Sequence, residues 1–319
     1  MVMFVPATPG PPHTHSLYTP SVAGAESNVA AYLHALGLTV NWISRVGEDS
    51  FGRFILDWLV TRGVDVSLVE RDPSWGTGVA FKEIGDEGTQ VTYFRSDSAF
   101  SKTTSTLARS VARSAPALIH TSGITLALSQ GCRDFVEAVH ALRGPQTVIS
   151  FDVNWRPSLW QPHRAHTASV DAQSTVLAAA QSSDVVFVGQ DEAEELWGVS
   201  DLTEIRRLVD EPRLLVVKRG SEGCTVFGDG EMIEVPALRV SVVEQVGAGD
   251  AFASGFLAGQ FRRLSLRDSA RLGTIVASSA LSVSTDVGPL PSPAYVDSLM
   301  RLSDAEWASS TYSPASLGK

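Results

Sequence analysis

Short apolar runs typical of buried strands alternate along this chain with longer stretches that have helical spacing. Short apolar runs suited to buried parallel strands cover residues 117–120, 147–152, 184–188 and 213–218. A helical stretch, 129–142, separates the first two of these runs. Alternation of buried strands with helices predicts an α/β fold in which helices cover both faces of a mainly parallel central sheet.

The first part of the chain follows the same alternation. Apolar residues within 29–36 keep one face of a helix that Gly37 ends, and 38–46 is expected to be a strand. A second helix is expected over 51–62, capped by Asp49 or Ser50. Residues 1–46 and 51–62 therefore extend the α/β pattern toward the N-terminus.

Residues 77–95 interrupt this alternation. Two strand-like runs, 77–82 and 90–95, flank the turn residues 85–88, which together predict a β-hairpin. A hairpin inserted into an α/β chain is either an edge decoration or a lid over a binding site.

A glycine-rich turn precedes the most apolar helical stretch, which reaches residue 259. Gly247, Ala248 and Gly249 let the backbone turn tightly, and Asp250 falls in the first turn of the helix. Free backbone N–H groups and the helix dipole favour an anion there, and a carboxylate beside it could accept a proton from an attacking hydroxyl. The alternative is an ordinary capped helix with a first-turn acid.

Composition narrows the class of protein. The 319 residues are 44% hydrophobic with a formal net charge of −10, which argues against a nucleic-acid partner. No apolar run approaches the ~18 residues of a membrane span, and the N-terminus does not resemble a signal peptide, so we expect a cytoplasmic protein. Cys132 and Cys224 share no metal-type spacing and are expected to be reduced core thiols.

Three more candidates follow predicted strands, where ligands collect in open parallel sheets. Arg156 offers a bidentate fork for a carboxylate or phosphate, although it could instead pair with Asp152 or a helix end. Lys218 precedes a glycine-rich turn that could hold a nucleotide or be an ordinary hairpin. Glu192 falls at the start of a predicted helix, where by itself it could be an ordinary solvated acid.

Two motifs resemble the signatures of the ribokinase (phosphofructokinase-B) family of sugar kinases. Residues 24–30, followed by Val-Gly-Glu-Asp-Ser-Phe-Gly at 46–52, are similar to the first signature of the family. Gly-Ala-Gly-Asp-Ala-Phe at 247–252 is similar to the second. In the first signature, Ala23 replaces the first glycine. Members usually begin with a complete strand ending near Gly-Glu or Gly-Asp, so we expect the start of this sequence to be misassigned or truncated.

The resemblance implies a single ribokinase-like domain over 1–319, with three layers and a small β-sheet lid built from segments about 7–20 and 77–97. In the family this lid closes over the sugar and often pairs with another subunit, so a homo-oligomer through the lid is expected. The implied partners are ATP, Mg²⁺ and a small sugar, with neither nucleic acid nor membrane.

The resemblance also assigns residue roles. Asp250 is the expected catalytic base, with the amides of Gly247, Ala248 and Gly249 stabilising the transferring phosphoryl group. The substrate is expected on Gly24, Asn28, Tyr93, Arg95 and Arg156. ATP is expected near Asn154, Lys218, Gly220 and Gly223, and magnesium near Glu192. Relatives commonly show Asp-Thr-Thr where this chain has Glu-Gln-Val at 244–246, so activation by a monovalent cation is doubtful.

Residues 24–28, 93–95, 120–129 and 152–160 resemble the branch of the family that phosphorylates 2-keto-3-deoxygluconate. A sugar acid gives Arg95 and Arg156 a carboxylate to bind, each charge-assisted bond contributing about 1.5 to 3 kcal/mol if sheltered from water. Arg95 could equally be a solvated charge on an edge strand. Two alternatives stay open: a kinase of a neutral sugar such as fructose, and a catalytically impaired sugar- or nucleotide-binding protein.

Overall fold

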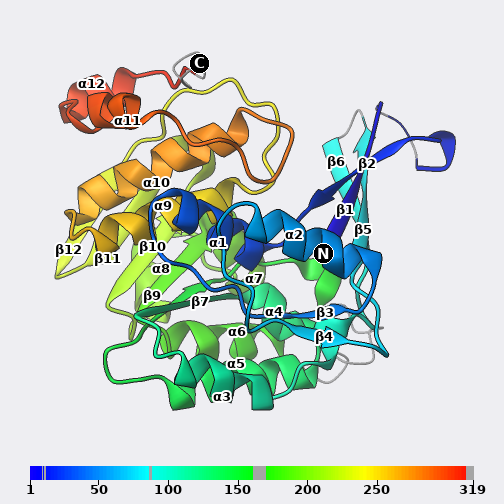
Figure 1. Ribbon diagram of the computed structural model, residues 1–319. Coiled ribbons are helices and arrows are strands. Elements are labelled where there is room, and N and C mark those ends of the chain that lie inside the picture. Colours follow the sequence, from blue (N-terminus) through cyan, green and yellow to red (C-terminus); the bar gives the residue numbers. More distant parts are fainter. Residues whose placement is uncertain (9, 11, 86–87, 161–169, 314–319) are drawn as a thin grey trace.

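The central sheet has the strand order β12-β11-β10-β9-β8-β7 (Figure 1). Its strands are β7 (Leu118–Ser122), β8 (Val148–Asp152), β9 (Val185–Gly189), β10 (Leu214–Lys218), β11 (Cys224–Gly228) and β12 (Glu231–Val235). The four strands from β7 to β10 are parallel, and β11 and β12 add an antiparallel edge. This computed structural model describes residues 1–8, 10, 12–85, 88–160 and 170–313. The predicted mainly parallel sheet is confirmed.

Helices cover both faces of this sheet. One layer holds α1 (Ala25–Ala35), α9 (Ala248–Phe261) and α10 (Leu266–Leu281). The other holds α3 (Thr106–Arg113), α4 (Gly123–Leu128), α5 (Gln130–Leu142), α6 (Ala172–Gln181), α7 (Gln190–Trp197) and α8 (Leu202–Leu208). Successive residues of β9 face opposite layers: Phe187 meets Phe256 of α9 at a ring-centroid distance of 5.5 Å, while Val186 and Val188 belong to the other core.

A separate four-stranded sheet, the lid sheet, stands at one end of the molecule (Figure 1). It has the order β2-β1-β5-β6, with β1 (Val2–Pro6), β2 (Tyr18–Val22), β5 (Val79–Gly85) and β6 (Gly88–Phe94). The predicted hairpin is confirmed as β5 and β6. The lid sheet also takes in β1, which lies outside the segments expected for it.

One expected strand is largely absent. Of residues 38–46, only the end enters β3 (Arg45–Gly47), which pairs with β4 (Glu70–Asp72) beside α2 (Ser50–Val60). Before it there is a single bridge, between Asn41 and Asp65. The prediction of a strand over 38–44 was wrong because the segment's backbone hydrogen bonds to residues 65–70 are scattered and do not form a continuous ladder before Arg45.

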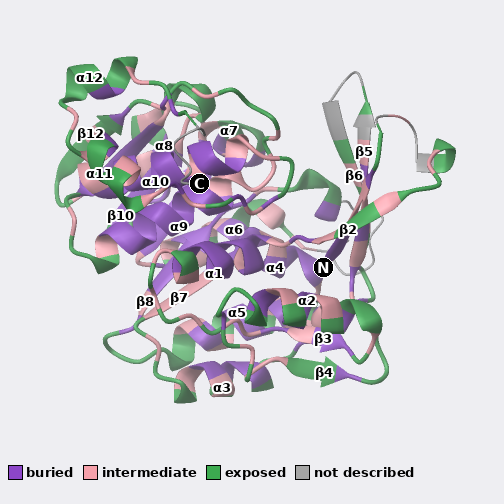
Figure 2. Ribbon diagram, turned by 45° about the horizontal axis from the view of Figure 1, so that its top comes forward, coloured by how far each residue is buried: buried purple, intermediate pink, exposed green. Residues whose placement is uncertain are grey.

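The C-terminal helices α11 (Pro293–Met300) and α12 (Asp304–Ser309) pack on the same side as α10. Figure 2 shows how thoroughly α9 is buried: every position from Asp250 to Gly259 is enclosed. Cys132 and Cys224 are free and buried, as expected. Within the described ranges, no helix combines the length and the apolar character that a bilayer crossing requires.

Candidate active site

A cavity of about 1900 Å³ runs between the lid sheet and the carboxyl ends of the central strands. At one end it is lined by Tyr93 and Arg95, in its middle by Asp250, and at the other end by residues 218–223 and 237–240. Small-molecule pockets commonly measure ~300–1000 Å³, so this cavity has room for two ligands, one on each side of Asp250. All the predicted site residues line its wall.

The start of α9 is the predicted anion hole, by which we mean the backbone N–H groups of residues 247–250. Gly247 is the N-cap with φ of +85°, in the left-handed region. A Cβ there would lie 2.4 Å from the carbonyl oxygen of Asp286, so a side chain at this position needs the neighbouring loop to move. The amide of Ala248 donates to the Gln245 carbonyl at 3.3 Å, which fixes the turn.

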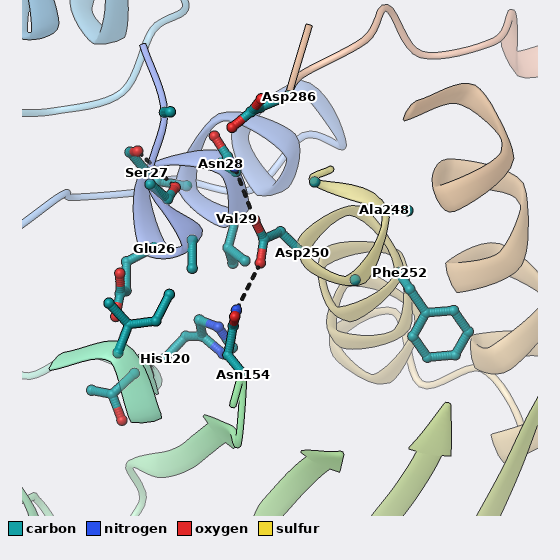
Figure 3. Close-up of a pocket in the computed structure, with 18 of the residues that line it drawn as sticks. Glu26, Ser27, Asn28, Val29, His120, Asn154, Ala248, Asp250, Phe252 and Asp286 are labelled. Carbon is teal, nitrogen blue, oxygen red and sulfur yellow. Dashed lines mark hydrogen bonds between the residues drawn. The ribbon is translucent and has the colours of Figure 1, made fainter. Parts of the chain in front are cut away.

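Two asparagine side chains hold Asp250, one on each carboxylate oxygen (Figure 3). Asn28 Nδ2 donates to Oδ2 at 2.9 Å from α1, and Asn154 Nδ2 donates to Oδ1 at 3.3 Å from the loop after β8. The amide oxygens of both asparagines are buried without a hydrogen-bond partner in the described structure. Such orphaned acceptors in a ligand-sized cavity fit a polar substrate that supplies hydroxyl donors.

Burial gives Asp250 the proton affinity of a base that works near neutral pH. Asp250 is only 8% exposed, and the resulting desolvation raises the pKa of its carboxyl group to about 7. The hydrogen bond from Asn28 opposes that rise, whereas the charge of Asp152 adds to it. A carboxyl group with a pKa near the working pH suits general-base catalysis.

The lid end of the cavity carries Arg95, which follows β6. Arg95 is only 8% exposed and its guanidinium lies 5.5 Å from the ring centroid of Tyr93. Its interpretation as a solvated edge charge is therefore wrong. Gly24, with φ of +149°, lines the same part of the cavity where α1 begins.

Arg156 lies against Glu192, in the first turn of α7, which is the helix-end alternative for this residue. Its Nη1 donates to the Trp155 carbonyl at 2.7 Å and lies 3.6 Å from Glu192 Oε1, and the side chain is half exposed. The alternative pairing with Asp152 is not what the structure records. Arg156 nevertheless lowers the pKa of Asp250, since its positive charge stabilises the carboxylate.

Lys218 ends β10 beneath the anion hole. Its ammonium group lies 2.9 Å from both carboxylate oxygens of Asp152 and 3.3 Å from the position of a Cβ on Gly249. The following turn uses Gly220 and Gly223 with positive φ, and a Cβ on Gly223 would lie 2.1 Å from the Val235 carbonyl oxygen. Lys218 therefore places a positive charge next to the anion hole.

Glu192 is a buried acid, with 16% of its side chain exposed, so the solvated alternative is wrong. Its two oxygens accept hydrogen bonds from the amides of Gly189 (2.7 Å) and Trp155 (3.0 Å). Burial raises its pKa, while Lys218 lowers it. In the described residues no group of three or more acids, histidines or cysteines could hold a metal ion on its own. Magnesium usually keeps several waters and takes one or two carboxylates plus phosphates, and Glu192, which lines the cavity, could be one such carboxylate.

Three features of the site were missed by the sequence reasoning. His120 lines the cavity (Figure 3) and shares a hydrogen bond of 3.0 Å with Ser150. Glu26 accepts hydrogen bonds from the hydroxyls of Ser122 and Thr125 beside it. The third feature is a buried ion pair from the lid, between Lys82 and Glu244. Nothing in the local sequence marks these contacts, because each joins residues far apart in the chain.

Known proteins resemble the chain along most of its length. A family model described as pfkB family carbohydrate kinase matches residues 1–293. A 2-dehydro-3-deoxygluconokinase of Thermoproteus tenax is 34% identical over 92% of this chain and 90% of its own length. One of Bacillus subtilis (strain 168) is 36% identical over 91% and 90%. The crystal structure of a PfkB protein from Polaromonas sp. JS666 superposes with a TM-score of 0.78 and 29% identity, over 90% of this chain and 95% of that one.

Proposed function

Because the chain belongs to the pfkB family of carbohydrate kinases and has its ribokinase-like fold, we propose that it phosphorylates a sugar acid, 2-keto-3-deoxygluconate, on its 6-hydroxyl. The oxygen of that hydroxyl attacks the γ-phosphorus of ATP, the bond to the β-phosphate oxygen breaks, and the hydroxyl proton goes to Asp250. The anion hole and Lys218 stabilise the charge that develops on the transferring group. An ATP-dependent enzyme of this kind would work in the cytoplasm, where ATP is made available.

The main structural support for a sugar-acid substrate is the buried guanidinium of Arg95 in the wall of the cavity. A carboxylate can accept charge-assisted hydrogen bonds from this guanidinium, whereas a neutral sugar offers it only uncharged oxygens. The two relatives described above have names that specify the same sugar acid. This agreement between charge and relatives favours a sugar acid over fructose.

The test is ADP release with magnesium-ATP, comparing 2-keto-3-deoxygluconate, fructose, ribose and gluconate at equal concentrations. Arg95→Ala should raise KM for the keto acid by about 10- to 150-fold, the equivalent of one charge-assisted hydrogen bond. Arg53→Ala, which removes an exposed arginine on α2, is the matched control. Turnover of fructose with an unchanged KM in Arg95→Ala would support the neutral-sugar alternative instead. ATP binding without ADP release from any sugar, in folded protein, would support a catalytically impaired binding protein.

ATP is proposed to bind on the Lys218 side of Asp250, with Asn154, Gly220 and Gly223 near it. Magnesium would be held by Glu192 together with the phosphates and water, and would neutralise charge on the transferring group. Glu192→Gln should therefore raise the magnesium concentration needed for half-maximal rate. An unchanged magnesium dependence in that variant would remove Glu192 from this role.

We also propose that two copies associate through the lid sheet. Its outer face carries a cluster of aromatic rings, in which Phe4 stacks on Phe81 at 5.0 Å and Phe94 meets Phe81 at 5.9 Å. Phe94 is exposed, and exposed apolar clusters of this kind mark interaction surfaces. Phe94→Lys should shift the protein toward monomer in sedimentation, and an unchanged mass, or a monomer at every concentration, would contradict this arrangement.

A further inference from the structure

Lys82 is a buried lysine on the inner face of the lid sheet that the proposed chemistry does not use. It lies in the middle of β5 and is only 3% exposed. Its ammonium group contacts Oε2 of Glu244, a residue 162 positions later in the chain. A lysine so deeply buried needs a paired charge, and Glu244 provides it.

The same carboxylate organises the loop that leads into the anion hole. While Oε2 contacts Lys82, Oε1 accepts hydrogen bonds from the amides of Gln245 (2.9 Å) and Val246 (3.3 Å). These amides directly precede Gly247, the N-cap of α9. The Glu244 carboxylate thus lies between the lid and the turn that carries the phosphoryl-binding amides.

Few other contacts hold this loop. The amides of Val243 and Glu244 both donate to one acceptor, the Leu281 carbonyl, at 2.8 and 3.4 Å. Val242 and Val243 are exposed, so apolar packing adds little here. The buried Asp286, whose carbonyl lies against Gly247, also feels the charge of Lys82, which lowers its pKa against the effect of burial.

We propose that Lys82 is a positioning residue that couples the lid to the anion hole, so that the amides of residues 247–250 are correctly oriented only while the lid covers the sugar end of the cavity. The pair would make phosphoryl transfer depend on lid position without Lys82 touching either substrate. This inference rests on the kinase activity of the family and not on which sugar the enzyme uses.

The first experiment is hydrogen–deuterium exchange on the protein without ligands, for the wild type and Lys82→Met. We expect faster exchange in peptides covering 241–248, because Glu244 loses the charge that fixes its carboxylate. Lys102→Met is the matched control, since Lys102 forms an exposed ion pair with Asp97 at 2.9 Å near the lid. Unchanged exchange over 241–248 in folded Lys82→Met would overturn the proposal whatever the substrate.

The second experiment separates positioning from simple loss of stability. With the sugar that the enzyme turns over best, Lys82→Met should lower kcat by about 10- to 100-fold, as expected for displaced phosphoryl-binding groups, and leave the sugar KM nearly unchanged. Lys82→Arg should restore part of kcat. A raised KM with normal kcat would instead make Lys82 a substrate contact and refute the proposal.

Glu244→Gln tests the same link from the other side and covers the case in which Lys82→Met does not fold. Its amide oxygen can still accept from Gln245 and Val246, but the charge that pairs with Lys82 is gone. We expect the same loss of kcat, and no further loss in the double variant, because both changes break one interaction. Multiplying losses would show that the two residues act independently and would contradict the coupling.

Discussion

Replacing Asn28 by leucine should move the pH dependence of catalysis. Asn28 Nδ2 donates to Asp250 Oδ2 at 2.9 Å, and both residues are buried. A hydrogen bond to a charged group contributes about 1.5 to 3 kcal/mol, and 1.36 kcal/mol corresponds to about one pKa unit. Losing it should raise the pKa of Asp250 from about 7 by roughly one to two units.

The assay is the pH profile of kcat/KM, which reports the ionisation of the free enzyme. Asp250 must be ionised to accept a proton, so activity falls on the acid side of its pKa. At pH 7 about half of the wild type carries the charged base, against roughly one tenth to one hundredth of Asn28→Leu. The acid limb of the variant should therefore shift to higher pH, with activity recovering in alkaline buffer.

Two further variants make the comparison specific. Asn154→Leu breaks a longer bond to Asp250, 3.3 Å, and should shift the limb less. Asn41→Leu breaks an asparagine–aspartate bond of 3.0 Å to Asp65, away from the base, and should leave the limb in place. An acid limb in Asn28→Leu that coincides with that of Asn41→Leu would refute this reasoning, even if turnover fell uniformly.

Four other outcomes follow from the structure. Asp250→Asn should lower kcat by about 10²- to 10⁴-fold as the base is lost. Burial raises the Asp250 pKa from 3.8 to about 7, so the folded wild type loses stability as the pH rises from about 4 to about 7. Asp250→Asn lacks this titrating group, and its melting temperature should therefore fall less over the same pH range. Gly255→Ala should destabilise by about 1 to 3 kcal/mol in urea unfolding, although alanine favours helices, because its Cβ would lie 2.7 Å from the Cα of Gly273. Replacing potassium by choline at constant ionic strength should leave the rate unchanged, because the Lys82 ammonium already pairs with Glu244, and a requirement for potassium would contradict this.

The parts of the site that the sequence predicts are those encoded locally. The turn at 247–249 needs glycine because Gly247 has positive φ and no space for a Cβ, and the helix after it is apolar on every side because it is buried throughout. The strands of the central sheet were predicted for the same reason, since strands buried on both faces are continuously apolar. Residues 38–44 show the limit of local reasoning: they have the composition of a strand, but strand pairing depends on a neighbour elsewhere in the chain.

The partners of the base could not be predicted in this way. Asn28 and Asp250 are 222 positions apart, and the family resemblance assigned Asn28 to the sugar and Asn154 to ATP. The structure shows both amides on the base, with their oxygens left for ligands. The sequence therefore selected residues that line one cavity, but which of their atoms contact one another emerged only from the fold.

The charges around Asp250 explain why its ionisation is so sensitive to one amide. The positive charge of Lys218 interacts with three carboxylates, those of Asp152, Glu192 and Asp250. Its two close contacts are both with the oxygens of Asp152. Lys218 therefore cannot fully stabilise the Asp250 carboxylate, and burial limits its hydration. The largest stabilising contribution comes from a neutral donor, Asn28, and the charge of Arg156 adds a smaller one. A base held by an amide keeps its proton affinity near neutral pH, whereas a direct ion pair with Lys218 would lower the pKa and weaken Asp250 as a proton acceptor.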